Sequence, residues 1–126
     1  MEELKDFFII NDELYRYNGT ETDVVIPGCV RTIRYCAFYN CRSIKGITIP
    51  DSVKSIGSRA FYGCEGLADK DGFVIVRGVL YDYFGSDENA SIPSGVTAIS
   101  DYVFDNCHSM KSITIPDSVM SIGGTV

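Results

Sequence analysis

The chain has 126 residues, 45% of them hydrophobic and 12% aromatic, which is enough to fold around one hydrophobic core. Its formal net charge is -6 and its Lys and Arg residues are scattered, which argues against nucleic acid as a partner. No apolar run approaches the roughly 20 residues of a membrane-spanning helix, and the first residues do not resemble a leader peptide, so we expect no membrane insertion by this chain.

The first predicted elements form a β-hairpin, and the same hairpin recurs later in the chain. The two hairpin segments align without a gap at an offset of 66 residues. Their turns, Asn11-Asp12 and Arg77-Gly78, are residue types suited to tight hairpins, and a polar loop follows each hairpin. The predicted strands are Phe7–Ile10 with Glu13–Tyr17, and Phe73–Val76 with Val79–Tyr83.

A 23-residue repeat follows each hairpin. ITIPDSVKSIG, from Ile47, and ITIPDSVMSIG, from Ile113, differ only at Lys54 against Met120, and weaker copies begin at Val24 and Ala90. Each copy places a proline directly after an alternating apolar segment. Proline cannot donate a hydrogen bond to a neighbouring strand, so it marks where the strand ends. The four prolines of the chain are Pro27, Pro50, Pro93 and Pro116.

Each repeat is predicted to form one coil of a solenoid. Its first residues alternate as a strand, and Ala60, Phe61, Cys64 and Leu67 recur at helical spacing. A coil would then contain a strand, an extended return and a helical turn. Because one coil cannot bury its apolar face alone, successive coils must stack and share a core. The predicted fold is a mainly β solenoid with short helical turns, a parallel sheet of stacked coils and two inserted β-hairpins.

We expect a single repeat domain over residues 1–126. It would contain an N-terminal cap and hairpin over 1–23, two repeats over 24–69, an inserted hairpin over 70–89, and one full and one truncated repeat over 90–126. The last repeat stops before its Phe and Cys positions. An open coil end exposes strand edges and apolar surface, which predicts self-association as an alternative to a monomer.

The pattern I-x-I-P-x-x-V-x-x-I-x-x-x-A-F-x-x-C-x-x-L, as in ITIPDSVKSIGSRAFYGCEGL, resembles the BspA-like, or treponemal-type, class of leucine-rich repeats. The resemblance implies a right-handed solenoid with a parallel sheet. It also implies a bacterial protein at the cell surface or secreted, with a role in adhesion to host proteins or other cells. No catalytic residues come with it.

The outward residues of the I-x-I-P strands are the candidate ligand-facing positions. Stacked coils would bring them into one row on the concave sheet, flanked by two lysines that favour acidic partners. The alternative is that short side chains are present only because they suit an exposed strand. The candidate residues are Val25, Thr48, Ser91, Thr114, Lys45 and Lys111.

The five cysteines contain no C-x-x-C pair, so we expect no zinc or thioredoxin-type site. Cys41, Cys64 and Cys107 share one repeat position and are predicted to be small buried hydrophobes with free thiols. Cys36 aligns with Arg59 and is predicted to be the most exposed thiol.

Catalytic chemistry has little support in the sequence. The single histidine, His108, aligns with Arg42 and Glu65, which indicates a solvated position rather than a general base. Nucleotide-binding glycine motifs and the G-x-S-x-G motif of hydrolases are missing from the sequence. We therefore expect no catalytic residues, no cofactor and no metal.

Four tyrosines recur in the hairpins at the 66-residue offset: Tyr15, Tyr17, Tyr81 and Tyr83. They could form an adhesive edge for a partner, or alternate members could close each hairpin onto the core.

The repeat class and the lack of a reactive constellation in the sequence favour a non-catalytic protein- or glycan-recognition module, and the family resemblance implies that it is part of an adhesin-like surface protein. The alternative is a structural spacer or self-assembling repeat unit.

Overall fold

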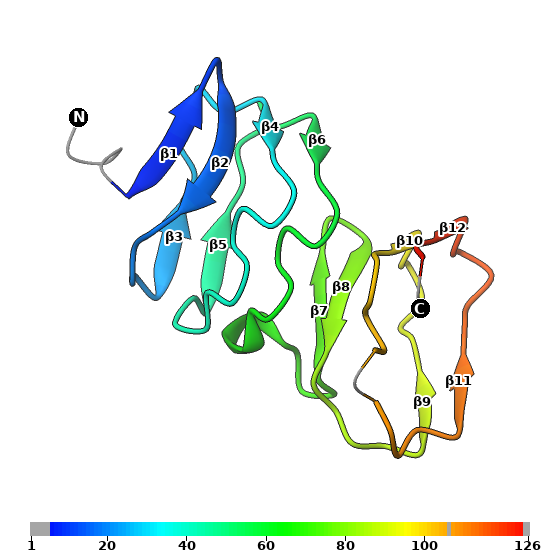
Figure 1. The fold of residues 1–126 in the computed structure, drawn as a ribbon. Helices are drawn as coiled ribbons and strands as arrows, with labels where there is room; N and C mark the ends of the chain where they lie inside the picture. Colours follow the sequence, from blue (N-terminus) through cyan, green and yellow to red (C-terminus); the bar gives the residue numbers. More distant parts are fainter. Residues whose placement is uncertain (1–5, 106, 125–126) are drawn as a thin grey trace. The chain divides into compact units, whose positions relative to one another are not determined.

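The structure is a computed structural model that describes residues 6–105 and 107–124. The chain divides into two compact units, Met1–Leu67 and Ala68–Val126, which we describe separately. Each unit is a short β-solenoid that begins with a hairpin and continues with stacked coils (Figure 1). The expectation of a single domain over 1–126 stays a prediction.

The first unit opens with the predicted hairpin, strands β1 (Phe7–Ile10) and β2 (Glu13–Tyr17). They pair antiparallel, with Phe7 opposite Tyr17 and a register shift between Phe8 and Ile9. Asn11 and Asp12 both have positive φ, at 51° and 65°, which is the backbone of a two-residue hairpin turn that follows the right-handed strand twist. The predicted turn and strand bounds are therefore confirmed.

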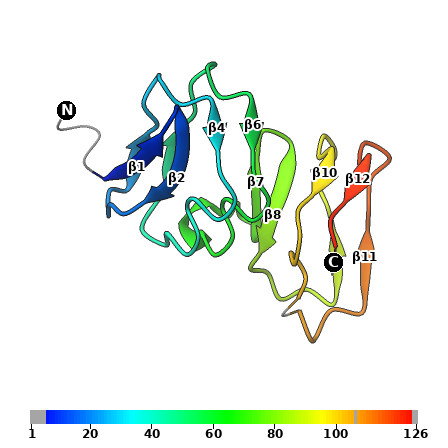
Figure 2. The same ribbon diagram turned by 45° about the horizontal axis from the view of Figure 1, so that its top comes forward.

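Two parallel stacks follow the hairpin. Strand β3 (Asp23–Val25) pairs with β5 (Gly46–Thr48), and β4 (Thr32–Ile33) lies between β2 and β6 (Ser55–Ile56). Each coil thus has two short strands, because part of the expected extended return also pairs with its neighbours. Strand β2 takes the place of a coil at the head of one stack, and β1 is its outer edge (Figure 2). The hairpin is therefore continuous with the coils.

The second unit repeats this arrangement. Its strands are β7 (Phe73–Val76), β8 (Val79–Tyr83), β9 (Asn89–Ser91), β10 (Ala98–Ile99), β11 (Ser112–Thr114) and β12 (Ser121–Ile122). Strands β7 and β8 form the antiparallel hairpin, β8 is followed by β10 and β12 in one parallel stack, and β9 pairs with β11 in the other. The hairpin turn at Arg77 and Gly78 again has positive φ at both positions, 50° and 79°.

The helical turn expected in each coil is a run of tight turns. In the first unit only the 3-10 helix η2 (Glu65–Leu67) is helical among the described residues. The amide of Ala60 donates to the Gly57 carbonyl at 3.3 Å, a hydrogen bond between residues three apart, as in a β-turn rather than an α-helix. Arg59 and Gly63 then have φ of 59° and 82°, and such left-handed residues interrupt an α-helix. The helical spacing of Ala60, Phe61, Cys64 and Leu67 is therefore produced by successive tight turns and not by an α-helix.

Aromatic rings form the centre of each core. In the first unit the ring of Phe38 lies between Tyr17, at 5.4 Å, and Phe61, at 5.2 Å, and both phenylalanines are fully buried. In the second unit Tyr83 contacts Phe104 at 5.8 Å. Tyr17 and Tyr83 therefore close their hairpins onto the core, which confirms that alternative for these two residues.

The other hairpin tyrosines differ from each other. Tyr81 is buried, with 2% of its surface exposed, although strand alternation predicts that it faces outward. Burial raises the pKa of Tyr81 to about 12, since the charged phenolate loses its hydration there. Tyr15 is only half-buried. It is the one hairpin tyrosine that remains accessible to a partner.

All five cysteines are free thiols, which was predicted for Cys41, Cys64 and Cys107, but the exposure of several of them differs from the prediction. Cys64 is buried and its thiol donates to the Phe38 carbonyl at 3.0 Å, whereas Cys41 and Cys107 are only partly buried. The prediction that Cys36 is the most exposed thiol is wrong, because Cys29 is exposed and Cys36 is half-buried. The Cys36 amide bonds the Ser58 carbonyl of the next coil, whereas Cys29 lies in a surface turn.

Candidate recognition surfaces

The strand face of the first unit is formed by β3 and β5. Val24 opposes Ile47 and Val25 opposes Thr48 in register. Val24 is buried, with 3% exposed, whereas Val25 is 66% exposed and Thr48 is also exposed. Alternation along the strand therefore turns Val24 toward the core and presents Val25 and Thr48 to solvent as neighbours.

The strand face of the second unit is formed by β9 and β11 in the same way. Ser91 opposes Thr114, and both are exposed, while Ala90 is buried. One pair along, Ser112 Oγ donates to Asn89 Oδ1 at 2.6 Å, so hydroxyl and amide groups are already arranged across the strands. Each unit brings two of the four predicted strand positions together. A single row of all four, and its place on a concave side, stay predictions.

The two flanking lysines lie just before β5 and β11 and are both exposed. Their amides donate to Thr22 and Glu88 carbonyls at 2.7 and 2.6 Å, which fixes their backbone beside the strand faces. Lys111 Nζ lies 3.8 Å from Glu88 Oε1, so its charge is partly compensated. The first unit has Thr22 and Asp23 where the second has Glu88 and Asn89, so a carboxylate also lies near Lys45, on the strand residue that opposes Gly46.

An arginine and two aromatic rings form a cluster on the outer face of the first hairpin. The guanidinium of Arg34 lies 4.5 Å from the ring centre of Tyr15, and its Nη1 donates to Glu13 Oε1 at 2.7 Å and to the Tyr15 hydroxyl at 2.9 Å. Phe8, 54% exposed, lies 5.9 Å from the Tyr15 ring. Aromatic residues and arginine are enriched at the energetic centres of protein interfaces, so this cluster suits a protein partner.

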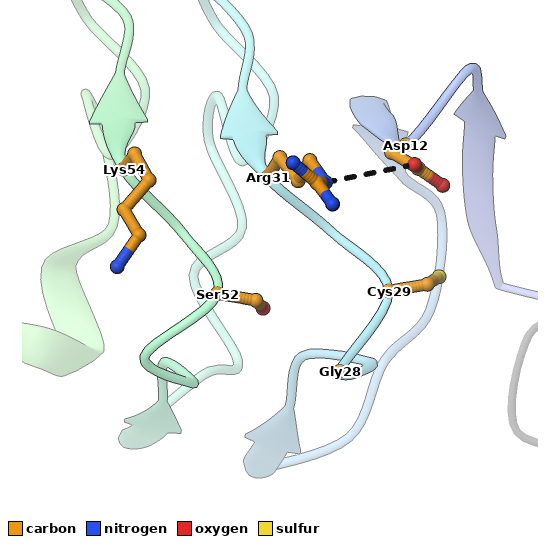
Figure 3. A pocket seen from close by; sticks show the side chains of 6 residues that line it. All are labelled: Asp12, Gly28, Cys29, Arg31, Ser52 and Lys54. Atoms are coloured by element: carbon orange, nitrogen blue, oxygen red, sulfur yellow. Dashed lines mark ion pairs between the residues drawn. The ribbon is translucent and has the colours of Figure 1, made fainter.

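A surface hollow of about 330 Å³ also lies in the first unit, between the hairpin turn and the turns after Pro27 and Pro50. Figure 3 shows the residues that line it, which come from these three segments. The sequence prediction missed it, although Arg31 and Lys54 occupy one repeat position that is Thr97 and Met120 in the second unit. Its lining residues are Asp12, Gly28, Cys29, Arg31, Ser52 and Lys54.

His108, the residue weighed as a general base, is exposed, in agreement with the solvated position predicted for it. Among the residues that the structure describes, no three His, Cys, Asp or Glu side chains are grouped so that they could hold a metal ion. Nor does any helix over 6–105 and 107–124 have the length and apolar character needed to cross a membrane.

The repeated coils of parallel strands, with a recurring apolar core and exposed strand faces, define a leucine-rich-repeat solenoid. The chain belongs to the BspA type leucine rich repeat family, whose model matches six copies over residues 9–71 and 77–126. This extends the predicted repeats, since the match over 9–71 begins within the first hairpin and includes β2.

Solved leucine-rich repeat structures are similar to this chain. A protein from Eubacterium ventriosum is 27% identical over 80% of this chain and 31% of its own, with a TM-score of 0.51. A leucine rich cell surface protein from Faecalibacterium prausnitzii is 26% identical over 92% of this chain and 42% of its own, with a TM-score of 0.43. The leucine rich repeat protein of T. pallidum is 20% identical over 88% and 77%, with a TM-score of 0.42.

The chain spans under half the length of the Eubacterium and Faecalibacterium proteins. No curated protein matches the sequence significantly.

Proposed function

We propose that this chain is a non-catalytic recognition module that binds a protein or a glycan through its exposed strand faces. In this proposal it is part of a bacterial, adhesin-like protein that is at the cell surface or secreted. Membership of the BspA type repeat family supports the recognition role and the surface context. The ligand-facing residues are the exposed strand residues and the two lysines beside them.

The observation that carries the proposal is the register of the paired strands. The strands present two exposed pairs, Val25 beside Thr48 and Ser91 beside Thr114. The residue before the first member of each pair, Val24 or Ala90, is buried in the core and fixes the strand. Such strands hold side chains in place without the entropy cost of ordering a loop, which favours binding. Thr48, Ser91 and Thr114 also offer hydroxyls that both donate and accept hydrogen bonds.

The test is binding of the wild-type chain to a glycan array and to immobilised extracellular-matrix proteins. For a ligand found there, Thr48→Arg and Thr114→Arg place a large charged side chain on each strand face and should weaken binding at least about tenfold. Thr20→Arg adds the same side chain at an exposed loop position and should leave binding unchanged. Equal binding by all variants would exclude the strand faces, and no wild-type binding to either panel would count against recognition.

A second candidate is a structural spacer or self-assembling repeat. The observation in its favour is the apolar surface on edge strands of both units: Phe8 and Ile10 on β1 are 54% and 43% exposed, and Ile122 on β12 is 52% exposed. Unpaired strand edges with apolar side chains are sites where copies of a protein associate. Under this proposal the partner is another copy of the chain.

A further inference from the structure

The hollow in the first unit is built on a regular backbone. The Arg31 amide donates to the Asp12 carbonyl and the Lys54 amide to the Arg31 carbonyl, each at 2.8 Å. These three residues are therefore successive positions of one hydrogen-bonded stack. Ser52 is held in the same way, since its Oγ donates to the Val30 carbonyl at 2.7 Å. The residues that line the hollow are thus positioned by neighbouring coils.

The charges in the hollow favour an anion. Its titratable groups are the carboxylate of Asp12, the guanidinium of Arg31, the ammonium of Lys54 and the thiol of Cys29. Arg31 Nε lies 3.8 Å from Asp12 Oδ2, but the two side chains are 77% and 54% exposed, so this ion pair is weak. The hollow carries one net positive charge in a chain whose net charge is -6.

The floor of the hollow leaves room for a small ligand. A Cβ added at Gly28 would meet no atom within 4 Å, and Cys29 and Ser52 are small side chains. The volume of about 330 Å³ is at the lower end for ligand sites, which corresponds to a monosaccharide-sized group. The polar side chains come from three neighbouring segments, with Asp12 on the hairpin turn, Arg31 on the next coil, and Ser52 and Lys54 on the coil after it, as Figure 3 shows.

The donors and acceptors present match an acidic sugar. A guanidinium can bind a carboxylate with two parallel hydrogen bonds, and an ammonium adds a third charged donor. Ser52 Oγ gives its own proton to Val30, so it accepts a hydrogen bond from a sugar hydroxyl, and Asp12 can accept another. A purely apolar or cationic ligand would offer no hydrogen-bond acceptor to Arg31 and Lys54.

We propose that this hollow binds the acidic residue of a glycan, with its carboxylate on Arg31 and Lys54 and its hydroxyls on Asp12 and Ser52. The inference rests on the proposed recognition function but assigns a site apart from the strand faces. In the second unit the equivalent positions carry no ionisable side chain. They are Gly78, Ser94, Gly95, Thr97, Ser118 and Met120.

The experiment is a titration of the full chain with methyl β-glucuronide, followed by NMR chemical shifts. Methyl β-glucoside, which lacks the carboxylate, should bind at least about tenfold more weakly, as expected when charged hydrogen bonds are lost. Sodium sulfate and glucosamine 6-sulfate test a sulfate as the anion. Binding of the glucoside as tight as that of the glucuronide, or of the sulfates in preference to it, would overturn the carboxylate assignment.

Variants copied from the second unit locate the site. Arg31→Thr and Lys54→Met introduce the residues that the same repeat position already has, so the coils should still stack, which thermal unfolding checks. Each should weaken glucuronide binding about tenfold or more, while Arg42→Ala, which removes one exposed charge elsewhere in the unit, should leave it unchanged. Undiminished binding by both folded hollow variants would overturn the proposal.

Alkylation of Cys29 gives an independent readout. Its thiol lines the hollow and is exposed, so iodoacetamide modification followed by mass spectrometry should be slowed by methyl β-glucuronide and not by the glucoside. An unchanged rate at saturating glucuronide would overturn the location. Thr48→Arg should retain glucuronide binding, so failure of this site and failure of the strand-face proposal can be distinguished.

Discussion

Phe38 is, with Phe61, one of the two largest fully buried side chains of the first unit. Its ring is fully buried between Tyr17 and Phe61, and its own backbone amide donates to the Ala60 carbonyl of the next coil at 2.8 Å. We expect Phe38→Ala to lower the free energy of unfolding by about 3–5 kcal/mol, since it removes apolar contacts and leaves a cavity. Chemical denaturation measures this.

Phe8→Ala is the matched control for that substitution, because Phe8 is 54% exposed on the same unit. It should cost less than about 1 kcal/mol. If the two variants lost similar free energies of unfolding, the stacked rings of Tyr17, Phe38 and Phe61 would not be the centre of the core.

The raised pKa of Tyr81 predicts a stability loss in alkali. Below pH 10 this phenol is protonated in both the folded and the unfolded chain. Between about pH 10 and 12 the unfolded chain releases the proton while the folded chain retains it, so the free energy of unfolding falls as pH rises. Denaturation across this range should show a smaller fall for Tyr81→Phe. If the free energy of unfolding fell equally in the wild type and in Tyr81→Phe, groups other than Tyr81 would cause the loss.

At the scale of the elements, the close contact between coils depends on Gly57. A Cβ at this position would collide with the backbone nitrogen of Tyr35 and lie 2.9 Å from the Arg34 carbonyl carbon. We expect Gly57→Ala to destabilise the chain by about 1–3 kcal/mol, because the backbone of one coil must move away from the next. Thermal unfolding measures the change. Gly28→Ala is the control, and an equal effect there would contradict the steric explanation.

The elements also differ in how far sequence patterns predicted them. The hairpins were predicted to the residue, since their turns require positive φ at adjacent positions and the strands alternate around them. The turns within the coils were predicted as helical, which was wrong. Cys36, Arg59 and Tyr102 have a left-handed backbone there, and residues of these types rarely adopt it, so the sequence did not indicate it. Hydrogen bonds to the neighbouring coil, such as Cys36 to Ser58, accompany this conformation and are not visible in one repeat alone.

At the scale of the whole molecule, the two functional proposals predict different assemblies. If the chain is a recognition module, size-exclusion chromatography with light scattering should find a monomer at high concentration. If it is a self-assembling repeat, larger species should form, and Ile10→Lys on the edge strand β1 should reduce them. Association that persists unchanged in Ile10→Lys would exclude this edge as the interface.

The sequence alone predicts the repeat period, the proline at each strand end, the two hairpins and the family, because these depend on local backbone chemistry that recurs along the chain. The folded chain was needed to show that β2 and β8 head the coil stacks, that Tyr81 is buried, and that Cys29 rather than Cys36 is exposed. It also brought Asp12, Arg31 and Lys54 around one hollow. Burial and charge clustering arise from contacts between coils, which no single repeat encodes.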